Sequence, residues 1–152
     1  MTTASEMTST RGNSCHRLGG TVQYLLDSDA VIDYINGVQR SVHFLEGFLT
    51  QGDGFCTCAV VVAEVFSGLM PERLTRGEQI LESCLFLDET FEIGRRAGEW
   101  RFDFRRRGLS VTDTIIAATA YENQAAIITG NVSDFRIPEL NVVALPRANR
   151  RF

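Results

Sequence analysis

Short apolar runs separated by helix-like segments are the feature that most constrains how this chain can fold. The runs are rich in β-branched residues and are not interrupted by alternating polar positions. A strand of this kind must be covered on both faces, as happens in a parallel sheet with helices on either side. The runs are TVQYLLD (21–27), FCTC (55–58), LFLDE (85–89), AAIITG (125–130) and NVVAL (141–145).

The segments between these runs carry the periodicity and the end signals of helices. Gly37, Pro71 and Gly108 stand where three of the helical patterns stop, and Ser110 or Thr112 can cap the last one. Right-handed crossovers between parallel strands place helices on both faces of a sheet. We therefore expect an α/β fold, a three-layer α/β/α sandwich around a central, mainly parallel sheet. The expected helices are 28–37, 42–49, 59–70, 73–84, 90–108 and 110–124.

The charge of the chain is unevenly distributed. All 15 basic residues are arginine, and the formal net charge is −4. Residues 22–146 contain 18 acids and 10 arginines, a balance of −8, whereas the two ends together carry +4. An acidic domain does not attract nucleic acid by its bulk charge. If the protein handles phosphates, a metal ion has to supply local positive potential.

The length of 152 residues suits one domain with a substantial core. The first 20 residues are rich in Ser, Thr, Gly and Arg and do not resemble a secretory signal. No apolar run approaches the roughly 18 residues that span a bilayer. We expect a flexible extension over 1–20, a domain over 21–146, a basic tail over 147–152, and a cytoplasmic protein with no membrane association.

The cysteines and histidines do not form a recognisable site. Cys56 and Cys58 are spaced C-x-C rather than C-x-x-C, and no second pair has metal-binding spacing. We expect these two, together with Cys15 and Cys84, to be buried or unreactive thiols. His16 and His43 have no partner that suggests a catalytic dyad, and we expect both at the surface.

Four acidic residues recur at comparable places in the pattern. Asp27 ends the first run, Glu64 lies in AVVVAEVFSGLM, Asp113 is in the first turn of the last helix, and Asp134 follows the fourth run. Ligands of open α/β sheets bind at the carboxyl ends of the strands. These acids are therefore candidates for one common site.

Taken singly, most of these acids have a structural explanation. Asp27 can cap a helix, Asp113 can favour a helix N-terminus, and Asp134 can serve a turn. Glu64 is harder to explain, because an ionised carboxylate among apolar neighbours is unfavourable unless it is paired or bound to metal. The chain has no lysine to neutralise the group. The four acids therefore predict a divalent cation, and oxygen ligands suit Mg²⁺ or Mn²⁺ rather than zinc.

At these residues the sequence resembles the PIN-domain family, and within it the VapC-type toxins of bacterial toxin–antitoxin pairs. The resemblance runs from about residue 24 to residue 145, and four motifs in order carry it. Two departures from the family pattern concern Asp29, where members often have Asn, and Asn131, where some have Asp. The second departure leaves the number of bound metal ions open. The motifs are LLDSDAVIDYI around Asp27 and Ser28, VVAEVFSGL around Glu64, VTDTIIAATA around Asp113, and ITGNVSDF with Thr129, Asn131 and Asp134.

The resemblance implies a metal-dependent ribonuclease that hydrolyses RNA phosphodiester bonds with metal-activated water. It also implies a homodimer and a cognate antitoxin that blocks the site. Asp27 and Asp113 would hold the principal Mg²⁺ or Mn²⁺, while Glu64 and Asp134 would bind a second ion or order the attacking water. Supporting positions are Ser28, Asp29, Thr129 and Asn131.

An arginine-rich segment, GRRAGEWRFDFRRRG, lies within the longest expected helix. Arg101 and Arg105 are one turn apart and share a face, so they could contact RNA phosphates or an acidic antitoxin segment. The alternative is a solvated helix face balanced by neighbouring acids such as Glu92 and Glu99.

Two other functions compete with the nuclease. DSDAV imitates the Asp-x-Asp motif of haloacid-dehalogenase-like phosphatases. Those enzymes normally use a lysine, which this chain lacks, and a phosphatase would give Glu64 no role. A catalytically silent PIN-like module that only binds RNA or protein is the other alternative, although it would have little use for clustered negative charge. A P-loop enzyme is excluded, because the chain contains no G-x-x-x-x-G-K-[ST].

Overall fold

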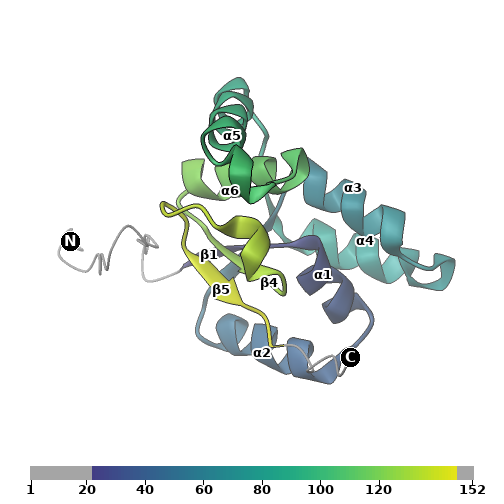
Figure 1. Cartoon of the computed structure of the whole chain (residues 1–152). Helices are drawn as coiled ribbons and strands as arrows, with labels where there is room; N and C mark the ends of the chain where they lie inside the picture. Colours follow the sequence, from purple (N-terminus) through teal and green to yellow (C-terminus); the bar gives the residue numbers. More distant parts are fainter. Residues whose placement is uncertain (1–21, 147–152) are drawn as a thin grey trace, which may run out of the picture.

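A sheet of parallel strands forms the centre of the molecule. The computed structural model describes residues 22–146, and its five-stranded sheet has the order β3-β2-β1-β4-β5 (Figure 1). All neighbouring strands are parallel, and each overlaps one of the apolar runs, which confirms the predicted α/β architecture. The strands are β1 (Gln23–Leu26), β2 (Gly54–Thr57), β3 (Leu85–Phe86), β4 (Ala126–Thr129) and β5 (Val142–Ala144).

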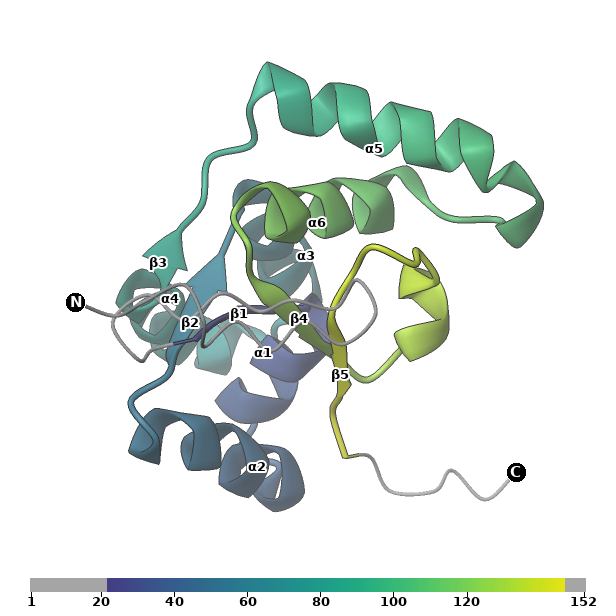
Figure 2. The same cartoon turned by 90° about the vertical axis from the view of Figure 1, so that its left-hand side faces the viewer.

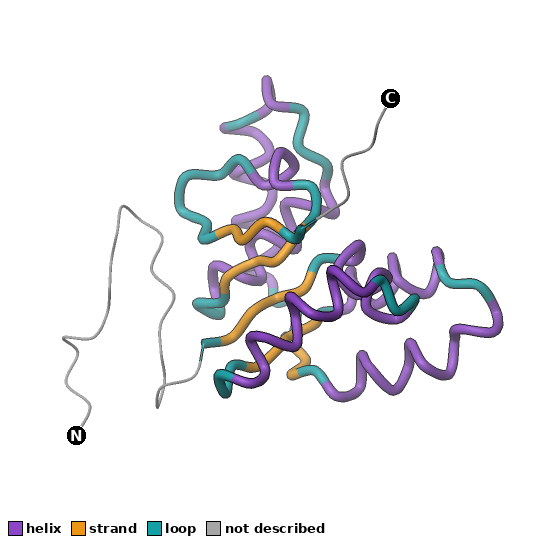
Figure 3. The backbone as a smooth tube through the Cα atoms, turned by 90° about the horizontal axis from the view of Figure 1, so that it is seen from below, coloured by secondary structure: helices purple, strands orange, loops and turns teal. Residues whose placement is uncertain are grey.

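Helices cover both faces of this sheet. Helices α5 and α6 lie on one side and α1 and α2 on the other, while α3 and α4 pack beside α1 (Figures 1 and 2). A view from below shows the strands enclosed by helical segments (Figure 3). The helices are α1 (Ser28–Ile35), α2 (Gln39–Thr50), α3 (Ala59–Gly68), α4 (Leu74–Ser83), α5 (Phe91–Asp103) and α6 (Val111–Glu122), with 3-10 turns η2 (Pro71–Arg73), η3 (Arg105–Arg107) and η4 (Val132–Phe135).

The chain reverses its direction of travel across the sheet between β1 and β4. It passes from β1 to β2 and β3 at one edge, and then returns to the other side of β1 for β4 and β5. Leu26 pairs with Ile128, and the backbone N–H of Asp27 continues the ladder by donating to the Ile128 carbonyl over 3.0 Å. Such a reversal opens a crevice at the carboxyl ends of the two strands. Asp27 and Thr129 stand at these two ends.

The core lies on both faces of β1 and β4. Leu25, Ile127 and Ile128 are completely buried, and they pack in one cluster with Ile35 of α1 and Ile116 of α6. Each such side chain stabilises the fold by about 1.5–3 kcal/mol relative to an exposed one. Every residue of β4 is buried, so this strand is a rigid base for the residues that follow it.

The arginine-rich helix is shorter than its sequence pattern predicted. Helix α5 begins after Thr90, whose hydroxyl accepts from the N–H of Ile93, and it ends at Asp103 instead of continuing to residue 108. Phe104 is its C-cap, a 3-10 turn follows, and Gly108 has a left-handed φ of 66°. The helical spacing of apolar residues continues through this turn. For this reason the predicted end of the helix lay five residues beyond the observed one.

The strand predicted over 85–89 is shorter and more exposed in the structure than the sequence indicated. Only Leu85 and Phe86 are in the sheet, and more than half of the surface of each is exposed. They form an edge strand with a neighbour on one side alone. An apolar run does not distinguish an edge strand from a central one.

The thiols of the described residues behave as predicted. Cys56 and Cys58 are buried, Cys84 is partly buried, and none of the three forms a disulfide. Burial raises the pKa of Cys58 to about 12, and a hydrogen bond to Glu89 together with its charge adds to the rise. His43 is exposed on α2, as expected.

Some predictions fall outside the part of the chain that is described. Cys15, His16, the N-terminal extension over 1–20 and the basic tail over 147–152 lie in this category, and the proposed domain limits remain a prediction. Within residues 22–146, no helix is long and apolar enough to cross a membrane.

Candidate active site

Asp27 is the most constrained acid at the strand ends. It directly follows β1, is only 5% exposed, and is the N-cap of α1. Its Oδ1 accepts from the backbone N–H of Ser28 at 2.8 Å, and its Oδ2 accepts from the hydroxyl of Thr129 at 2.7 Å. The bond from Ser28 comes from its main chain. The carboxylate is therefore held between the first turn of α1 and the end of β4.

Asp29 connects the first turn of α1 to the loop after β4. Its Oδ2 accepts from the N–H of Gly130 at 2.9 Å and from Nδ2 of Asn131 at 3.3 Å. The backbone N–H of Asn131 in turn donates to the Thr129 hydroxyl at 3.0 Å. Thr129 thus contacts Asp27 and Asn131 together. Three of the four predicted supporting positions, Asp29, Thr129 and Asn131, form one hydrogen-bonded unit.

Asp113 is oriented by the residue that caps its helix. The hydroxyl of Ser110 accepts from the backbone N–H of Asp113 at 3.0 Å and donates to Asp113 Oδ2 at 2.7 Å. Of the two caps considered from the sequence, Ser110 therefore has this role rather than Thr112. The side chain of Asp113 is half-buried.

Glu64 lies in the middle of α3, the helix that contacts both α1 and α6. The sequence analysis treated Glu64 as an acid among apolar residues, but its side chain is only partly buried. Val61 and Val65 turn into the core, whereas Glu64 is partly exposed. Consecutive residues of a helix face different directions, and apolar neighbours in the sequence therefore did not imply burial.

Asp134 is the most exposed of the four predicted acids. It belongs to η4, and its backbone N–H donates to the Asn131 carbonyl at 2.9 Å. Phe135 is buried and anchors the turn to the core. The turn therefore presents Asp134 at the surface of the strand ends.

The acids act on one another electrostatically. Burial raises the pKa of Asp27 to about 6; the hydrogen bonds from Thr129 and Ser28 oppose the rise, and the charges of Asp29 and Asp113 add to it. Burial likewise raises the pKa of Asp113, opposed by the hydrogen bond from Ser110 and assisted by the charges of Asp134, Glu64 and Asp29. All four predicted acids and Asp29 therefore share one region of negative potential, which we call the acidic cluster.

The acidic cluster suits a hard divalent cation in its chemistry. Its donors are carboxylate oxygens, which Mg²⁺ and Mn²⁺ prefer. Within the described residues, no three Asp, Glu, His or Cys side chains are already placed to hold a metal ion. The raised pKa values nevertheless show that the ionised carboxylates are disfavoured by burial and mutual repulsion, and a cation would offset both effects.

Glu89 is a positioning residue that the sequence analysis missed. Its Oε1 accepts from the N–H of Val60 at 3.0 Å, in the first turn of α3. The N-cap residue of that helix, Cys58, makes no side-chain capping bond of its own. Glu89 therefore fixes the start of the helix that carries Glu64. The contact joins residues 29 positions apart, and no local sequence signal indicates it.

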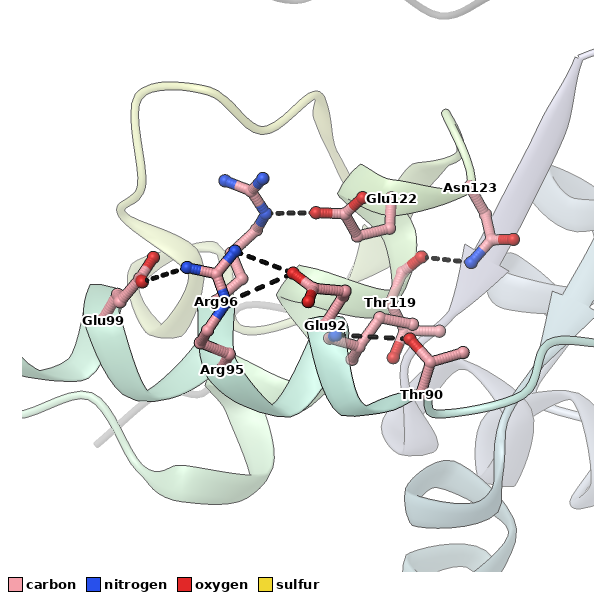
Figure 4. Close-up of polar contacts among 9 residues, drawn as sticks. Thr90, Glu92, Arg95, Arg96, Glu99, Thr119, Glu122 and Asn123 are labelled. Carbon is pink, nitrogen blue, oxygen red and sulfur yellow. Dashed lines mark hydrogen bonds and ion pairs between the residues drawn. The ribbon is translucent and has the colours of Figure 1, made fainter.

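The arginines of α5 and η3 fall into two groups. Arg95 pairs with Glu92 and Glu99 at 2.7 and 2.8 Å, and Arg96 pairs with Glu122 of α6 (Figure 4). The balanced helix face considered as an alternative describes this group. Arg101 and Arg105 instead line a groove beside α6.

Known proteins resemble this chain in sequence and in fold. The family model described as PIN domain matches residues 24–138. Ribonuclease VapC19 of Mycobacterium tuberculosis is 26% identical over 113 residues, which cover 73% of this chain and 90% of that protein. The solved structure of VapBC2 from Rickettsia felis bound to a promoter DNA fragment matches with a TM-score of 0.69 and 21% identity, covering 81% of this chain and 98% of that one. A toxin–antitoxin complex from Klebsiella pneumoniae matches with a TM-score of 0.69 and 24% identity over 82% of this chain and 99% of that one.

Proposed function

This chain belongs to the PIN-domain family, and from that membership we propose that it is a ribonuclease acting as the toxin of a toxin–antitoxin pair. The observation that carries the proposal is the acidic cluster, which gathers acids from α1, α3, α6 and η4 at the reversal between β1 and β4. The similarity to a protein named as a ribonuclease, over 90% of its length, supports the same activity. The substrate is RNA, and the bond hydrolysed is a phosphodiester.

The acidic cluster would hold Mg²⁺ or Mn²⁺ through Asp27 and Asp113, with Glu64 and Asp134 binding a second ion or ordering water. Such an ion supplies water of lowered pKa and neutralises charge on the phosphate. Thr129 and the Ser28 amide hold the Asp27 carboxylate in a fixed orientation. Ser110 holds Asp113 in the same way.

The remaining contacts position the elements that carry these acids. Asp29 ties the first turn of α1 to Gly130 and Asn131, and so fixes the loop that leads to η4. Glu89 fixes the first turn of α3. These hydrogen bonds thus orient both the acids and the segments that carry them.

We include a cognate antitoxin and a second copy of the chain as partners in this proposal. The solved structures that match the fold include toxin–antitoxin complexes from several bacteria. An antitoxin would bind the toxin and restrain its nuclease activity, and a homodimer is the assembly implied by the family resemblance.

The structure gives a reason to prefer the nuclease to a haloacid-dehalogenase-like phosphatase. In Asp-x-Asp phosphatases both carboxylates serve the substrate. Here Asp29 accepts from Gly130 and Asn131 and secures a loop. Activity measurements distinguish the nuclease from a catalytically silent PIN-like module.

The test is cleavage of labelled RNA by the purified protein and by Asp27→Asn. We expect Mg²⁺- or Mn²⁺-dependent cleavage by the wild type, loss of cleavage with EDTA, and loss in Asp27→Asn with an unchanged circular dichroism spectrum. Glu46→Gln, which alters an exposed acid on α2, should cut at the wild-type rate. Cleavage by Asp27→Asn at that rate would refute the assignment.

The same preparation separates the two alternatives. A phosphatase would release p-nitrophenol from p-nitrophenyl phosphate, and we expect none. A silent module would leave RNA intact with either metal.

A further inference from the structure

A groove of about 620 Å³ lies between α5, η3 and the start of α6. Gly94, Ala97 and Gly98 form its wall along α5, and Gly108 to Ser110 line its other end. Because the α5 wall carries small side chains, the space between the helices stays open.

The charge of this groove is opposite to that of the domain. Arg101 and Arg105 are the only charged side chains among its lining residues. Arg101 donates through Nε to the Leu109 carbonyl, and Arg105 donates through Nη1 to the Phe102 carbonyl. Within residues 22–146, neither forms an ion pair with a carboxylate, in contrast to Arg95. Both guanidinium groups therefore keep their charge available to an anion.

The groove also presents an aromatic ring to solvent. Phe102 lines it and is 68% exposed, and the guanidinium carbon of Arg105 lies 4.7 Å from the ring centroid. An exposed ring next to a guanidinium offers a flat surface and a cation together. A nucleotide combines the matching features, a base that stacks on aromatic rings and a phosphate that binds arginine.

The groove is continuous with the acidic cluster. Ser110 lines the groove and donates to the carboxylate of Asp113 at 2.7 Å. A strand of RNA with a phosphate at Asp113 would reach the groove by passing Ser110.

We propose that this groove is a nucleotide subsite of the nuclease. Phe102 stacks on the base of a nucleotide next to the bond that is cut, and Arg101 and Arg105 bind its phosphate. The inference rests on the proposed function and adds a specific place where the RNA is held. An acidic protein segment would also satisfy the arginines, but it has no need of an aromatic ring, and this difference makes the proposal testable.

The experiment measures RNA binding in the Asp27→Asn protein, which does not cut its ligand. The probe is a short, fluorescein-labelled, single-stranded RNA of randomised sequence, followed by anisotropy in Mg²⁺ at several salt concentrations. Phe102→Ala should weaken binding about 5- to 150-fold, the equivalent of ~1–3 kcal/mol for one stacked base. Phe102→Trp should bind as tightly as the parent, whereas Phe102→Leu should resemble Phe102→Ala.

The arginines and the matched controls are measured in the same way. Arg101→Ala and Arg105→Ala should each reduce the slope of log K against log salt by about 0.7, the value for one phosphate contact on a single strand. Phe91→Ala removes a ring that is 84% exposed on the same helix, and Arg95→Ala removes a charge paired with Glu92 and Glu99. Both should leave RNA binding unchanged.

A spectroscopic measurement reports stacking itself. RNA that contains 2-aminopurine should lose fluorescence on binding the parent and Phe102→Trp, but not on binding Phe102→Leu. If Phe102→Leu bound RNA like the parent, the ring would not be a stacking surface and the inference would fall while the nuclease stood. If the parent bound no RNA, both the inference and the proposed function would fall.

Discussion

Asp27 directs its two carboxylate oxygens to different elements. Oδ1 accepts from the first peptide of α1, and Oδ2 accepts from Thr129 at the end of β4. Both contacts are at or below 2.8 Å, and the bond to Thr129 is buried. Hydrogen bonds to a buried charged group have large effects on stability, so this residue links the fold to the site.

Thr129→Val tests that link, because it removes the hydroxyl and keeps a side chain of similar size. We expect the free energy of unfolding at neutral pH to fall by about 1.5–3 kcal/mol. The pKa of Asp27 should rise further, since the bond from Thr129 now lowers it. Denaturant unfolding gives the first quantity. Thr129→Ser keeps the hydroxyl and serves as control, and equal stability of the two variants would contradict the prediction.

The raised pKa of Asp27 also makes stability depend on pH. The carboxyl titrates near 3.8 in the unfolded chain and near 6 in the folded one. Between these values the folded state holds a proton that the unfolded state has lost, so the free energy of unfolding falls as pH rises. The contribution is up to ~3 kcal/mol, complete below pH ~4 and lost above pH ~6.

Urea unfolding in EDTA checks this, with Asp27→Asn as the reference that lacks the titrating group. The wild type should lose stability relative to Asp27→Asn between about pH 4 and pH 7. A difference between the two proteins that stays constant over this range would show that the pKa of Asp27 is ordinary.

The sequence identified single residues where acidic side chains recur at equivalent places, at the ends of strands and the starts of helices. Asp27 and Asp113 stand out because one follows a strand and the other begins a helix, and the structure couples them electrostatically. Glu64 was singled out as an acid among apolar sequence neighbours, but it is only partly buried on α3. Glu89 could not be found at all, because its role depends on a contact with Val60 that only the folded chain creates.

At the scale of elements, the ends of helices decide where the functional groups lie. Helix α6 is capped by its own residue Ser110, whereas α3 is capped by Glu89 from the loop after β3. Local capping signals are visible in a sequence and capping from a distance is not. For this reason the start of α6 could be predicted with its cap, while the support of α3 could not.

Glu89→Ala should therefore weaken the first turn of α3. We expect a loss of about 1 kcal/mol in the free energy of unfolding, the usual effect of removing a helix cap. Faster amide hydrogen exchange should be confined to the start of α3, and RNA cleavage should fall because this helix carries Glu64. Glu89→Gln keeps an acceptor oxygen and should behave like the wild type. Unchanged exchange in Glu89→Ala would show that another group caps the helix.

Boundaries were the least predictable property of the elements. The apolar and aromatic spacing of 90–108 continues past Asp103, but the backbone tightens into η3 and turns at Gly108. Arg105 therefore belongs to η3 rather than to α5, and it lines the same groove beside α6 as Arg101. The sequence indicated that Arg101 and Arg105 act together. The groove that they line forms only when α5 packs on α6.

At the scale of the whole molecule, the acidic cluster predicts that metal binding stabilises the fold. Mg²⁺ at a hundred times its dissociation constant should raise the free energy of unfolding by about 2.7 kcal/mol. The expected rise in melting temperature should disappear in Asp27→Asn and persist in Glu46→Gln. A thermal shift assay with Mg²⁺ and Mn²⁺ measures it. No shift with either metal in the wild type would count against the proposed centre.

The architecture was the most predictable level. Apolar runs between helices, combined with right-handed crossovers, require a covered parallel sheet, and the sheet has that form. What the sequence could not provide is the distance between carboxylates from separate elements. Those distances depend on side-chain packing across the end of the sheet.

The reversal between β1 and β4 has a consequence for synthesis of the protein. Asp27 depends on Thr129, which is 102 residues further along the chain. A growing polypeptide still attached to the ribosome lacks the hydroxyl that orients Asp27 until β4 has left the exit tunnel. The buried hydrogen bond that orients Asp27 therefore forms only after β4 has been synthesised.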